Sequence, residues 1–328
     1  MNTSISSIDE FALIDEIKKI FAKPKKNKII TANIGDDCFC FKIGTKNICI
    51  TKDVLVENVH FKKNWTTPFE LGQKAIEVNI SDIAAMGNVT PKYVFIGLCL
   101  PKKTPHHFFH ELYKGLKKSC DKYKAIIAGG DTVKSDKLTI SVTVVGVAKG
   151  NIIKRSGAEN GDLIGVTNTF GDAAAGVALL CKYGQKHIYN AYQKNLIAKQ
   201  NAPQARLKIA QKISNHITAL TDASDGLWSA VDLIAKSSMK GAKIFVDTIA
   251  ISQNLRKVFK EKKLQQNFAL FGGEDYELVF SVSKSKAQFL KKIAPEISYI
   301  GEINNSNNIT VIENGKEQNS KYKGFKHF

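Results

Sequence analysis

Apolar residues recur at helical spacing in several stretches of this chain. The first predicted helix has a capping box at Ser7 and Glu10 and an apolar face that extends to Phe21. A second helix is predicted over 67–86, where a proline in the first turn favours a helix start. The remaining predicted helices cover 109–120, 171–181, a segment opened by Pro203, and 228–236.

Short runs rich in β-branched residues alternate with these helices. The predicted strands cover 38–43, 48–53, 125–128, 138–147, 162–167, 242–246 and 276–282. Glu313-Asn314-Gly315-Lys316 predicts a hairpin turn. The polar, glycine-containing segment 149–161 indicates a boundary, so we expect an α/β (α+β) chain with domains at 1–149 and 150–328.

Composition is that of an ordinary globular protein. The 328 residues suffice for two hydrophobic cores, and 43% of them are apolar. No apolar run approaches the roughly 18 residues that span a bilayer, and the N-terminus does not resemble a secretory signal. The six cysteines form no C-x-x-C pair, which predicts reduced, structural thiols and a cytoplasmic protein.

The formal charge of +18 raises the possibility of a nucleic-acid partner. Arginine occurs only at Arg155, Arg206 and Arg256, and the lysines are scattered rather than gathered into one basic arm. This distribution favours a composition bias and no nucleic-acid partner. A basic nucleic-acid-binding protein stays as the alternative from another class, and it predicts salt-dependent binding without ATP turnover.

Acidic residues are the minority charge, yet they gather beside glycines and hydroxyls. Asp222-Ala223-Ser224-Asp225-Gly226 is the densest such segment, and similar ones lie at Asp36-Asp37, Asp53, Ser81-Asp82 and Gly130-Asp131. Oxygen-rich sites of this kind suit hard divalent cations, which here indicates Mg²⁺ carrying the phosphates of a nucleotide. The leading hypothesis is an ATP-using enzyme.

In two of these segments, the periodicity of the strand or helix indicates which face carries the acidic side chain. In the strand over 48–53, Thr51 and Asp53 share one face and Lys52 points to the other. Asp82 extends an apolar helical stripe, where an unpaired carboxylate is costly. The alternatives are a strand end that runs into solvent at Asp53 and an exposed helix end at Asp82.

The remaining segments are less specific. Gly129-Gly130-Asp131 is interpreted as a turn that closes a short strand, and glycines there let a backbone approach a phosphate. Ser224 or Asp225 can instead cap the following helix. His60 can bind a substrate phosphate or simply pack. The P-loop and protein-kinase motifs are absent from the sequence, so ATP would bind through metals and glycine turns of another kind.

Taken in order, these segments resemble the thiamine-monophosphate kinase family, in the superfamily that includes aminoimidazole ribonucleotide synthetase. The matching segments are 34–38, Asp53 with 59–61, 78–87, 129–132, 155–158, 224–227, 272–278 and the terminal 322–328. The resemblance implies a two-domain fold whose N-terminal sheet forms a homodimer and whose C-terminal α/β domain closes the cleft. It also implies ATP-dependent phosphorylation of thiamine phosphate to thiamine diphosphate, assisted by Mg²⁺.

The resemblance also implies roles for individual residues. Implied metal ligands are Asp37, Thr51, Lys52 (through its backbone carbonyl), Asp53, Asp82, Asp131, Asp222 and Asp225, with Asp53, Asp82 and Asp131 as the catalytic set. Gly130, Asp131, Arg155 and Ser224 would contact ATP, and His60, Glu274 and Tyr322 would face thiamine phosphate.

Two residues depart from the family pattern, because Lys52 replaces a small or hydroxyl residue and Asn168 replaces a common glycine. The nearest rival is another ATP-using enzyme of the superfamily, of the aminoimidazole ribonucleotide or selenophosphate synthetase type. The segment 272–278 and the terminal motif argue against it.

Overall fold

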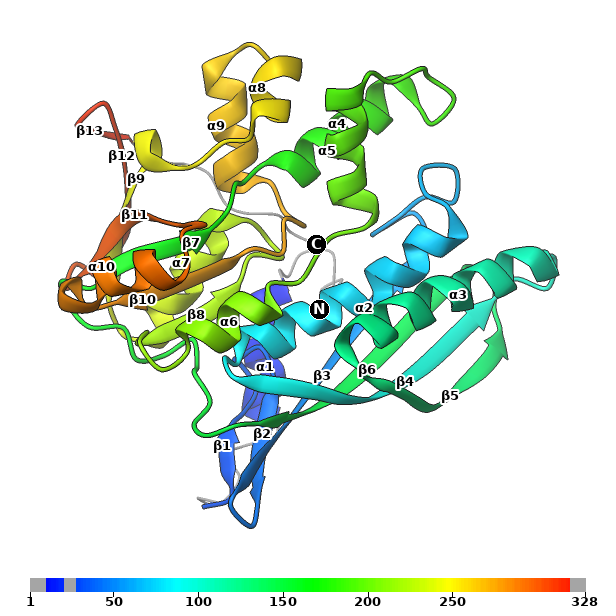
Figure 1. Cartoon of the computed structure of the whole chain (residues 1–328), viewed down its shortest axis with the longest axis horizontal. Helices are drawn as coiled ribbons and strands as arrows, with labels where there is room; N and C mark the ends of the chain where they lie inside the picture. Colours follow the sequence, from blue (N-terminus) through cyan, green and yellow to red (C-terminus); the bar gives the residue numbers. More distant parts are fainter. Residues whose placement is uncertain (1–9, 21–27, 319–328) are drawn as a thin grey trace, which may run out of the picture.

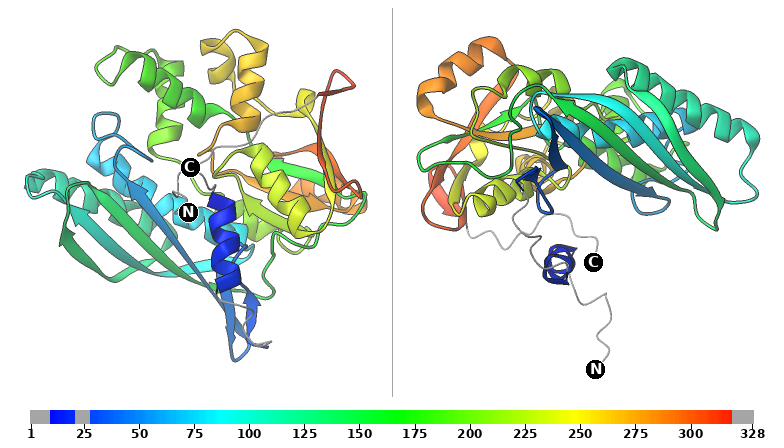
Figure 2. Two further views of the ribbon diagram at one scale, coloured as in Figure 1. Left: turned by 180° about the vertical axis from the view of Figure 1, so that it is seen from behind. Right: turned by 90° about the horizontal axis from the view of Figure 1, so that it is seen from below.

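The chain folds around two β-sheets, one in each half of the sequence. The structure is a computed structural model that describes residues 10–20 and 28–318. Seen from below in Figure 2, the first half (blue to green) lies beside the second half (yellow to red). No helix within the described ranges is both long enough and apolar enough to cross a membrane.

Within the described residues, the first half of the chain contains three helices and six strands, labelled in Figure 1. Its helices are α1 (Glu10–Ile20), α2 (Pro68–Ala85) and α3 (His106–Tyr123). Its strands are β1 (Ile30–Ala32), β2 (Phe39–Ile43), β3 (Lys46–Val56), β4 (Val89–Leu100), β5 (Ile126–Lys134) and β6 (Thr139–Ala148), paired in the order β1-β2-β3-β6-β4-β5. The capping box predicted at Ser7 lies outside the described residues.

Helix α2 begins where the sequence predicts. Thr67 and Glu70 form a reciprocal capping box, and Pro68 occupies the first turn. Thirteen of its residues are buried, because α2 lies against the first sheet on one side and against β8 and α6 of the second half on the other. The helix is therefore an internal support shared by both halves.

The glycine turn predicted after the strand 125–128 is wrong. Gly129, Gly130 and Asp131 lie inside β5, which pairs with β4 through Lys134. Gly130 has φ of +154°, and a Cβ there would lie 1.9 Å from the carbonyl oxygen of Ile96. Its glycine permits close approach of two strands and does not reverse the chain. Strand β4 itself was not predicted, because Pro91 and Gly97 weaken its local strand signal.

The second half of the chain forms a mixed β-sheet, and hydrophobic cores cover both of its faces. Its strands are β7 (Leu163–Thr167), β8 (Ala219–Asp222), β9 (Gly241–Phe245), β10 (Leu278–Val282), β11 (Ile297–Asn304), β12 (Ile309–Glu313) and β13 (Lys316–Gln318), in the order β13-β12-β9-β11-β7-β10-β8. All five residues of β10 are buried. Phe280 packs into the core that includes α2, and Val279 packs into a second core with α7.

Helices fill the rest of the second half. They are α4 (Asp172–Tyr183), α5 (Ala191–Asn201), α6 (Leu207–Ile213), α7 (Leu227–Ser237), α8 (Gln253–Val258), α9 (Lys262–Phe271) and α10 (Lys284–Ile293), with a short 3₁₀ turn at Val246–Thr248. The helix predicted to open at Pro203 is wrong in its start, because α6 begins at Leu207. The predicted hairpin turn is confirmed between β12 and β13, with Asn314 and Gly315 both at positive φ.

The two halves share one hydrophobic core. Its buried residues include Ile80 of α2, Leu207 of α6 and Leu220 of β8. The connection between the halves runs from the end of β6 at Ala148 to the start of β7 at Leu163. The exact domain boundary at 149/150 stays a prediction.

Candidate active site

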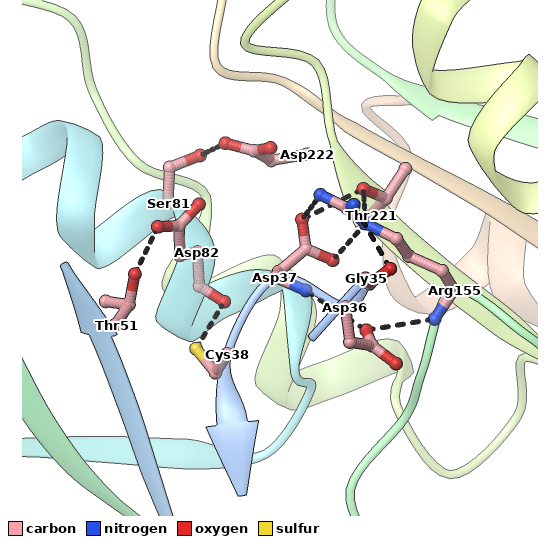
Figure 3. Close-up of polar contacts among 10 residues, drawn as sticks. All are labelled: Gly35, Asp36, Asp37, Cys38, Thr51, Ser81, Asp82, Arg155, Thr221 and Asp222. Carbon is pink, nitrogen blue, oxygen red and sulfur yellow. Dashed lines mark hydrogen bonds and ion pairs between the residues drawn. The ribbon is translucent and has the colours of Figure 1, made fainter. Parts of the chain in front are cut away.

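Three carboxylates from distant parts of the sequence meet where the two halves of the chain join. Asp37 lies in the loop before β2, Asp82 in the last turn of α2, and Asp222 at the end of β8. Oxygen atoms of these three side chains all lie within 4.8 Å of one another. Figure 3 shows the arrangement, which we call the acidic cluster. The structure thus brings together three of the predicted metal ligands.

Neighbouring hydroxyls fix two of these carboxylates. Thr51 Oγ1 donates to Asp82 Oδ2 at 2.5 Å, and Ser81 Oγ donates to Asp222 Oδ2 at 2.6 Å. Thr51 comes from β3, on the face that the strand alternation predicts. Lys52 lies on the opposite face, and its Nζ donates to Thr143 Oγ1 at 3.5 Å.

The third carboxylate is held by an arginine from the segment between β6 and β7. Arg155 Nη2 lies 2.7 Å from Asp37 Oδ1, and its Nε lies 3.2 Å from Asp37 Oδ2, a bidentate pair. Thr221 Oγ1 also donates to Asp37 Oδ1 at 3.0 Å. The backbone N–H of Arg155 donates to Asp36 Oδ1 at 3.2 Å. Arg155 therefore supplies the positive charge beside the cluster.

Burial and mutual repulsion disfavour the ionised form of these acids. Burial, and then the charge of Asp37, raises the pKa of Asp222 to about 7, against the lowering effect of the Ser81 hydroxyl. Burial and the charges of Asp53, Asp222 and Asp37 hold the pKa of Asp82 well above its usual range. Burial and the charge of Asp225 raise the pKa of Asp53 to about 6. Hard oxygen donors that repel one another when ionised fit a divalent cation such as Mg²⁺.

A cavity of about 540 Å³ opens beside Asp82 and extends toward α5. Carboxylates, a hydroxyl and aromatic rings all line it. The lining residues that bear on function are Asp53, Asp82, Ser224, Asp225, His60, Glu274, Phe61, Trp65, Phe271 and Tyr276. A cavity lined by carboxylates, a hydroxyl and aromatic rings suits a ligand that carries both a phosphate and a flat ring.

The turn that carries Ser224 and Asp225 packs closely on a second turn. Gly226, with φ of +97°, is the N-cap residue just before α7, and this helix has no side-chain cap. Capping therefore does not account for Ser224 and Asp225. The carbonyl oxygen of Ser224 accepts from the backbone N–H of Glu274 at 2.6 Å. A Cβ at Gly273 would lie 2.8 Å from that same oxygen, which explains a glycine there.

His60 and Glu274 both line the cavity. His60 Nδ1 accepts from the backbone N–H of Val56 at 3.0 Å. Glu274 Oε1 lies 2.9 Å from Lys74 Nζ, and its Oε2 accepts from Gln200 Nε2. Tyr322, the third residue implied to face the substrate, lies outside the described residues.

Gly130 and Asp131 do not join the acidic cluster within one chain. Asp131 pairs with Gly97 of β4, which pairs with Ser141 of β6, which pairs with Val54 of β3. Asp131 is therefore three strands from β3, about 14 Å away. Paired residues of neighbouring strands point to the same face of a sheet, so Asp131 lies on the face of Val54 and Lys52. Asp53 lies on the opposite face.

Several residues of the site were not singled out in the sequence. Thr221 precedes Asp222 and Ser81 precedes Asp82, and both of these acids were singled out. Adjacency to them is the signal that would have identified the two hydroxyl side chains. Lys74 and Gln200 carry no comparable signal, because only the fold brings α2 and α5 to Glu274.

The backbone conformation of Asn168 explains why asparagine can replace glycine at this position. It has φ of +48°, in the left-handed region where asparagine and glycine are both tolerated. Its side-chain Nδ2 donates to Glu277 Oε2 at 3.0 Å. The predicted departure from glycine is thus compatible with the turn.

Comparison with known proteins agrees with this architecture. Residues 35–148 match the family model of the AIR synthase related protein, N-terminal domain, and residues 159–314 match that of the C-terminal domain. A solved structure described as AaThiL complexed with AMPPCP and TMP superimposes with a TM-score of 0.88, at 34% sequence identity, and covers 100% of both chains. The predicted two-domain fold of the superfamily is confirmed.

Curated relatives match over almost the whole length. The chain is 35% identical to the thiamine-monophosphate kinase of Aquifex aeolicus over 327 residues, which cover 99% of each protein. It is 38% identical to the thiamine-monophosphate kinase of Buchnera aphidicola subsp. Schizaphis graminum over 328 residues, which cover 98% of this chain and 99% of that protein. The chain therefore belongs to the thiamine-monophosphate kinase family.

Proposed function

We propose that this protein transfers the γ-phosphoryl group of ATP to thiamine phosphate and so forms thiamine diphosphate. The observation that carries the proposal is the acidic cluster, whose three carboxylates lie within 4.8 Å of one another beside a cavity of about 540 Å³. Family membership supports it, as does a relative at 34% identity that binds AMPPCP and TMP.

The physical problem in this reaction is the approach of two polyanions. At about 4 Å, two unit charges repel by about 4 kcal/mol with an effective dielectric near 20, and phosphates carry more than one charge each. Mg²⁺ bound by the cluster would neutralise charge on both phosphates and on the leaving oxygens. We assign it to Asp37, Thr51, Asp53, Asp82, Asp222 and Asp225, with Asp131 and the backbone carbonyl of Lys52 as further ligands.

The remaining residues are each assigned to one of the two substrates. We assign Arg155 and Ser224, with Gly130 and Asp131, to ATP, and His60, Glu274 and Tyr322 to thiamine phosphate. The bidentate contact of Arg155 with Asp37 supports its position beside the phosphates. The aromatic wall formed by Phe61, Trp65 and Phe271 supports a flat ring in the acceptor site.

Transfer is proposed to be direct and in line. A phosphate acceptor is already ionised near pH 7, so its oxygen needs no strong general base. The task of the side chains is to hold donor and acceptor in line and to keep water away. A protein-bound phosphate trapped during turnover would refute direct transfer.

We propose that the protein is a homodimer joined through the outer face of the first sheet, opposite α2. This face exposes large apolar side chains, with Val54 41%, Phe95 43%, Tyr93 49% and Val133 46% exposed. A patch of this kind marks an interaction surface. β5 also leaves one strand edge unpaired. We propose that Asp131 reaches an active site only in the dimer, where the second copy contributes it.

All six cysteines are free, and three of them, Cys38, Cys40 and Cys49, are buried in β2 and β3 or just before them. This supports the proposed reducing, cytoplasmic location.

The test is a product assay on the purified full-length chain. Thiamine diphosphate should form only when thiamine phosphate, ATP and Mg²⁺ are all present, and EDTA should abolish it. ATP consumption without thiamine phosphate, or with another acceptor in its place, would favour the rival synthetase activities of the superfamily. Tight, salt-dependent binding to DNA or RNA without ATP turnover would favour the nucleic-acid alternative.

A further inference from the structure

Lys74 is a buried lysine in the middle of helix α2. Only 2% of its surface is exposed. An unpaired ammonium group at such a site would cost several kcal/mol, so its partners must explain its presence. Nζ lies 2.9 Å from Glu274 Oε1 and donates to the backbone carbonyl of His60 at 3.3 Å. One ammonium therefore contacts both described segments that we assign to the acceptor substrate.

The segment of Glu274 depends on this contact for its position. Glu274 is not glycine, yet its φ is +69°, in the left-handed region where a side chain is strained. Its backbone N–H donates to Ser224, and its second carboxylate oxygen accepts from Gln200 Nε2 of α5. Lys74 from α2 and Gln200 from α5 thus hold the carboxylate from two sides, and the charged partner is Lys74.

The segment of His60 is a short turn after β3. The backbone N–H of Asn58 donates to Phe61 at 2.7 Å, and that of His60 donates to Val56 at 3.0 Å. These bonds close the turn on itself. Lys74 Nζ donates to the carbonyl oxygen of His60 and so ties this turn to α2.

Lys74 is not among the residues that line the main cavity, whereas His60 and Glu274 are. We infer that Lys74 is a positioning residue, which fixes the distance between the His60 turn and the Glu274 turn and so shapes the site for the phosphate acceptor. The inference rests on the proposed function for the identity of that acceptor. It acts through Glu274 and His60 and makes no contact with the acceptor.

The test is Lys74→Met, which keeps an unbranched side chain only one atom shorter and removes the ammonium. KM for thiamine phosphate should rise at least about tenfold, while KM for ATP and the Mg²⁺ requirement stay within about twofold of the wild-type values. Lys74→Arg should restore part of the affinity, because it returns a positive donor. Equal changes in both KM values, or an unchanged KM for thiamine phosphate, would overturn the inference.

Lys122→Met is the matched control on the same helix pair. Lys122 Nζ lies 2.8 Å from Glu77 Oε1, and Glu77 is a buried residue of α2 one turn from Lys74. Neither residue lines the main cavity. The control should lower the unfolding temperature without a selective change in KM for thiamine phosphate. A selective change in this control would show that any lost lysine–glutamate pair on α2 has the same effect, against the inference.

Lys74→Met leaves the partly buried Glu274 without its charged partner, so the double variant Lys74→Met/Glu274→Gln removes that mismatch. Because Lys74 acts through Glu274, the double variant should raise KM for thiamine phosphate by less than the product of the two single effects. A fully multiplicative result would contradict the inference.

A substrate-free readout separates this inference from the proposed function. In Lys74→Met, hydrogen exchange should accelerate at the backbone N–H groups of Asn58, His60 and Glu274, while α3 and β6 exchange as in the wild type. If the wild-type protein makes no thiamine diphosphate, the proposed function fails, and this exchange experiment still decides the positioning role. Unchanged exchange at the two turns would overturn it.

Discussion

The predicted metal-binding residues lie on two opposite faces of the first sheet, and the two sets differ in nearly every physical respect. On the inner face, Asp82 is enclosed by three other acids and a hydroxyl from β3. On the outer face, Asp131 is exposed on an edge strand, and its Oδ1 accepts from the backbone N–H of Thr132 at 2.8 Å. The inner set is assembled by one chain, whereas we propose that the outer set takes part only in a dimer.

This difference shows what kind of neighbour each acid requires. The inner carboxylates are desolvated and repel one another, so a divalent cation relieves a cost that the fold has already imposed. Asp131 bears no such cost in a single chain. Its contribution to a site would come from the approach of a second copy across the apolar outer face.

We expect the largest effect from Asp82→Asn. Turnover should fall by at least about a thousandfold, because a central carboxylate of the cation site is lost. The unfolding temperature in EDTA at pH 8 should not fall, because the amide removes repulsion with Asp53, Asp222 and Asp37. Steady-state kinetics and thermal unfolding measure the two effects.

Asp53→Asn should behave in the same way. Asp121→Asn is the control, since Asp121 is exposed on α3 and forms a surface ion pair with Lys117. A near-normal rate in Asp82→Asn or Asp53→Asn would remove that residue from the active site.

The second prediction tests the outer face. Asp131→Asn should lose at least about a hundredfold in turnover if each site takes Asp131 from the partner copy. Co-folding equal amounts of Asp131→Asn and Asp82→Asn chains should then recover about a quarter of the wild-type activity, because half of the random dimers hold one intact site. A co-folded mixture no more active than its separate components would contradict a shared site.

The third prediction concerns pH and follows from the raised carboxyl pKa values. Asp222 titrates near 7 in the folded protein and at the ordinary 3.8 when unfolded, so the folded state binds the proton more tightly. Stability contributed by this group is therefore greatest below about pH 4 and is lost as pH rises to about 7. Asp53, with a pKa of about 6, acts in the same direction.

Mg²⁺ favours the ionised carboxylates, so its stabilising effect should grow with pH. The increase in unfolding temperature on adding Mg²⁺ should be larger at pH 8 than at pH 5, by several degrees. Differential scanning fluorimetry of the wild type and of Asp222→Asn measures it, and the variant should show a smaller pH dependence. A Mg²⁺ effect that is equal at both pH values would argue against the cluster as the cation site.

The smallest effect is expected from Lys52→Ala. The side chain is exposed on the outer face, with a long contact to Thr143 at 3.5 Å, and only its backbone carbonyl is proposed to bind metal. Turnover and Mg²⁺ dependence should stay within about twofold of the wild type. A large loss of activity would show that the Lys52 ammonium itself takes part in the active site. The side chains of the outer face could then no longer be separated from the metal site within one chain.

Local patterns predicted much of the fold. The capping box of α2, the alternation in β3 and the Asn-Gly hairpin are confirmed, because each depends on residues adjacent in sequence. The glycine pair at Gly129-Gly130 was misinterpreted for the opposite reason. A glycine that permits close approach to Ile96 is indistinguishable, in sequence alone, from one that permits a turn.

The sequence by itself determined which residue types are available: hard oxygen ligands at Asp37, Asp53, Asp82 and Asp222, arranged in an order that resembles one family. The tertiary structure decided which of them meet. Convergence of β8 on α2 and the loop before β2 is a product of packing between segments more than a hundred residues apart, and so is the contact of Lys74 with Glu274. Side-chain periodicity fixes a face of a strand or helix, but only sheet order and helix packing fix what lies opposite that face.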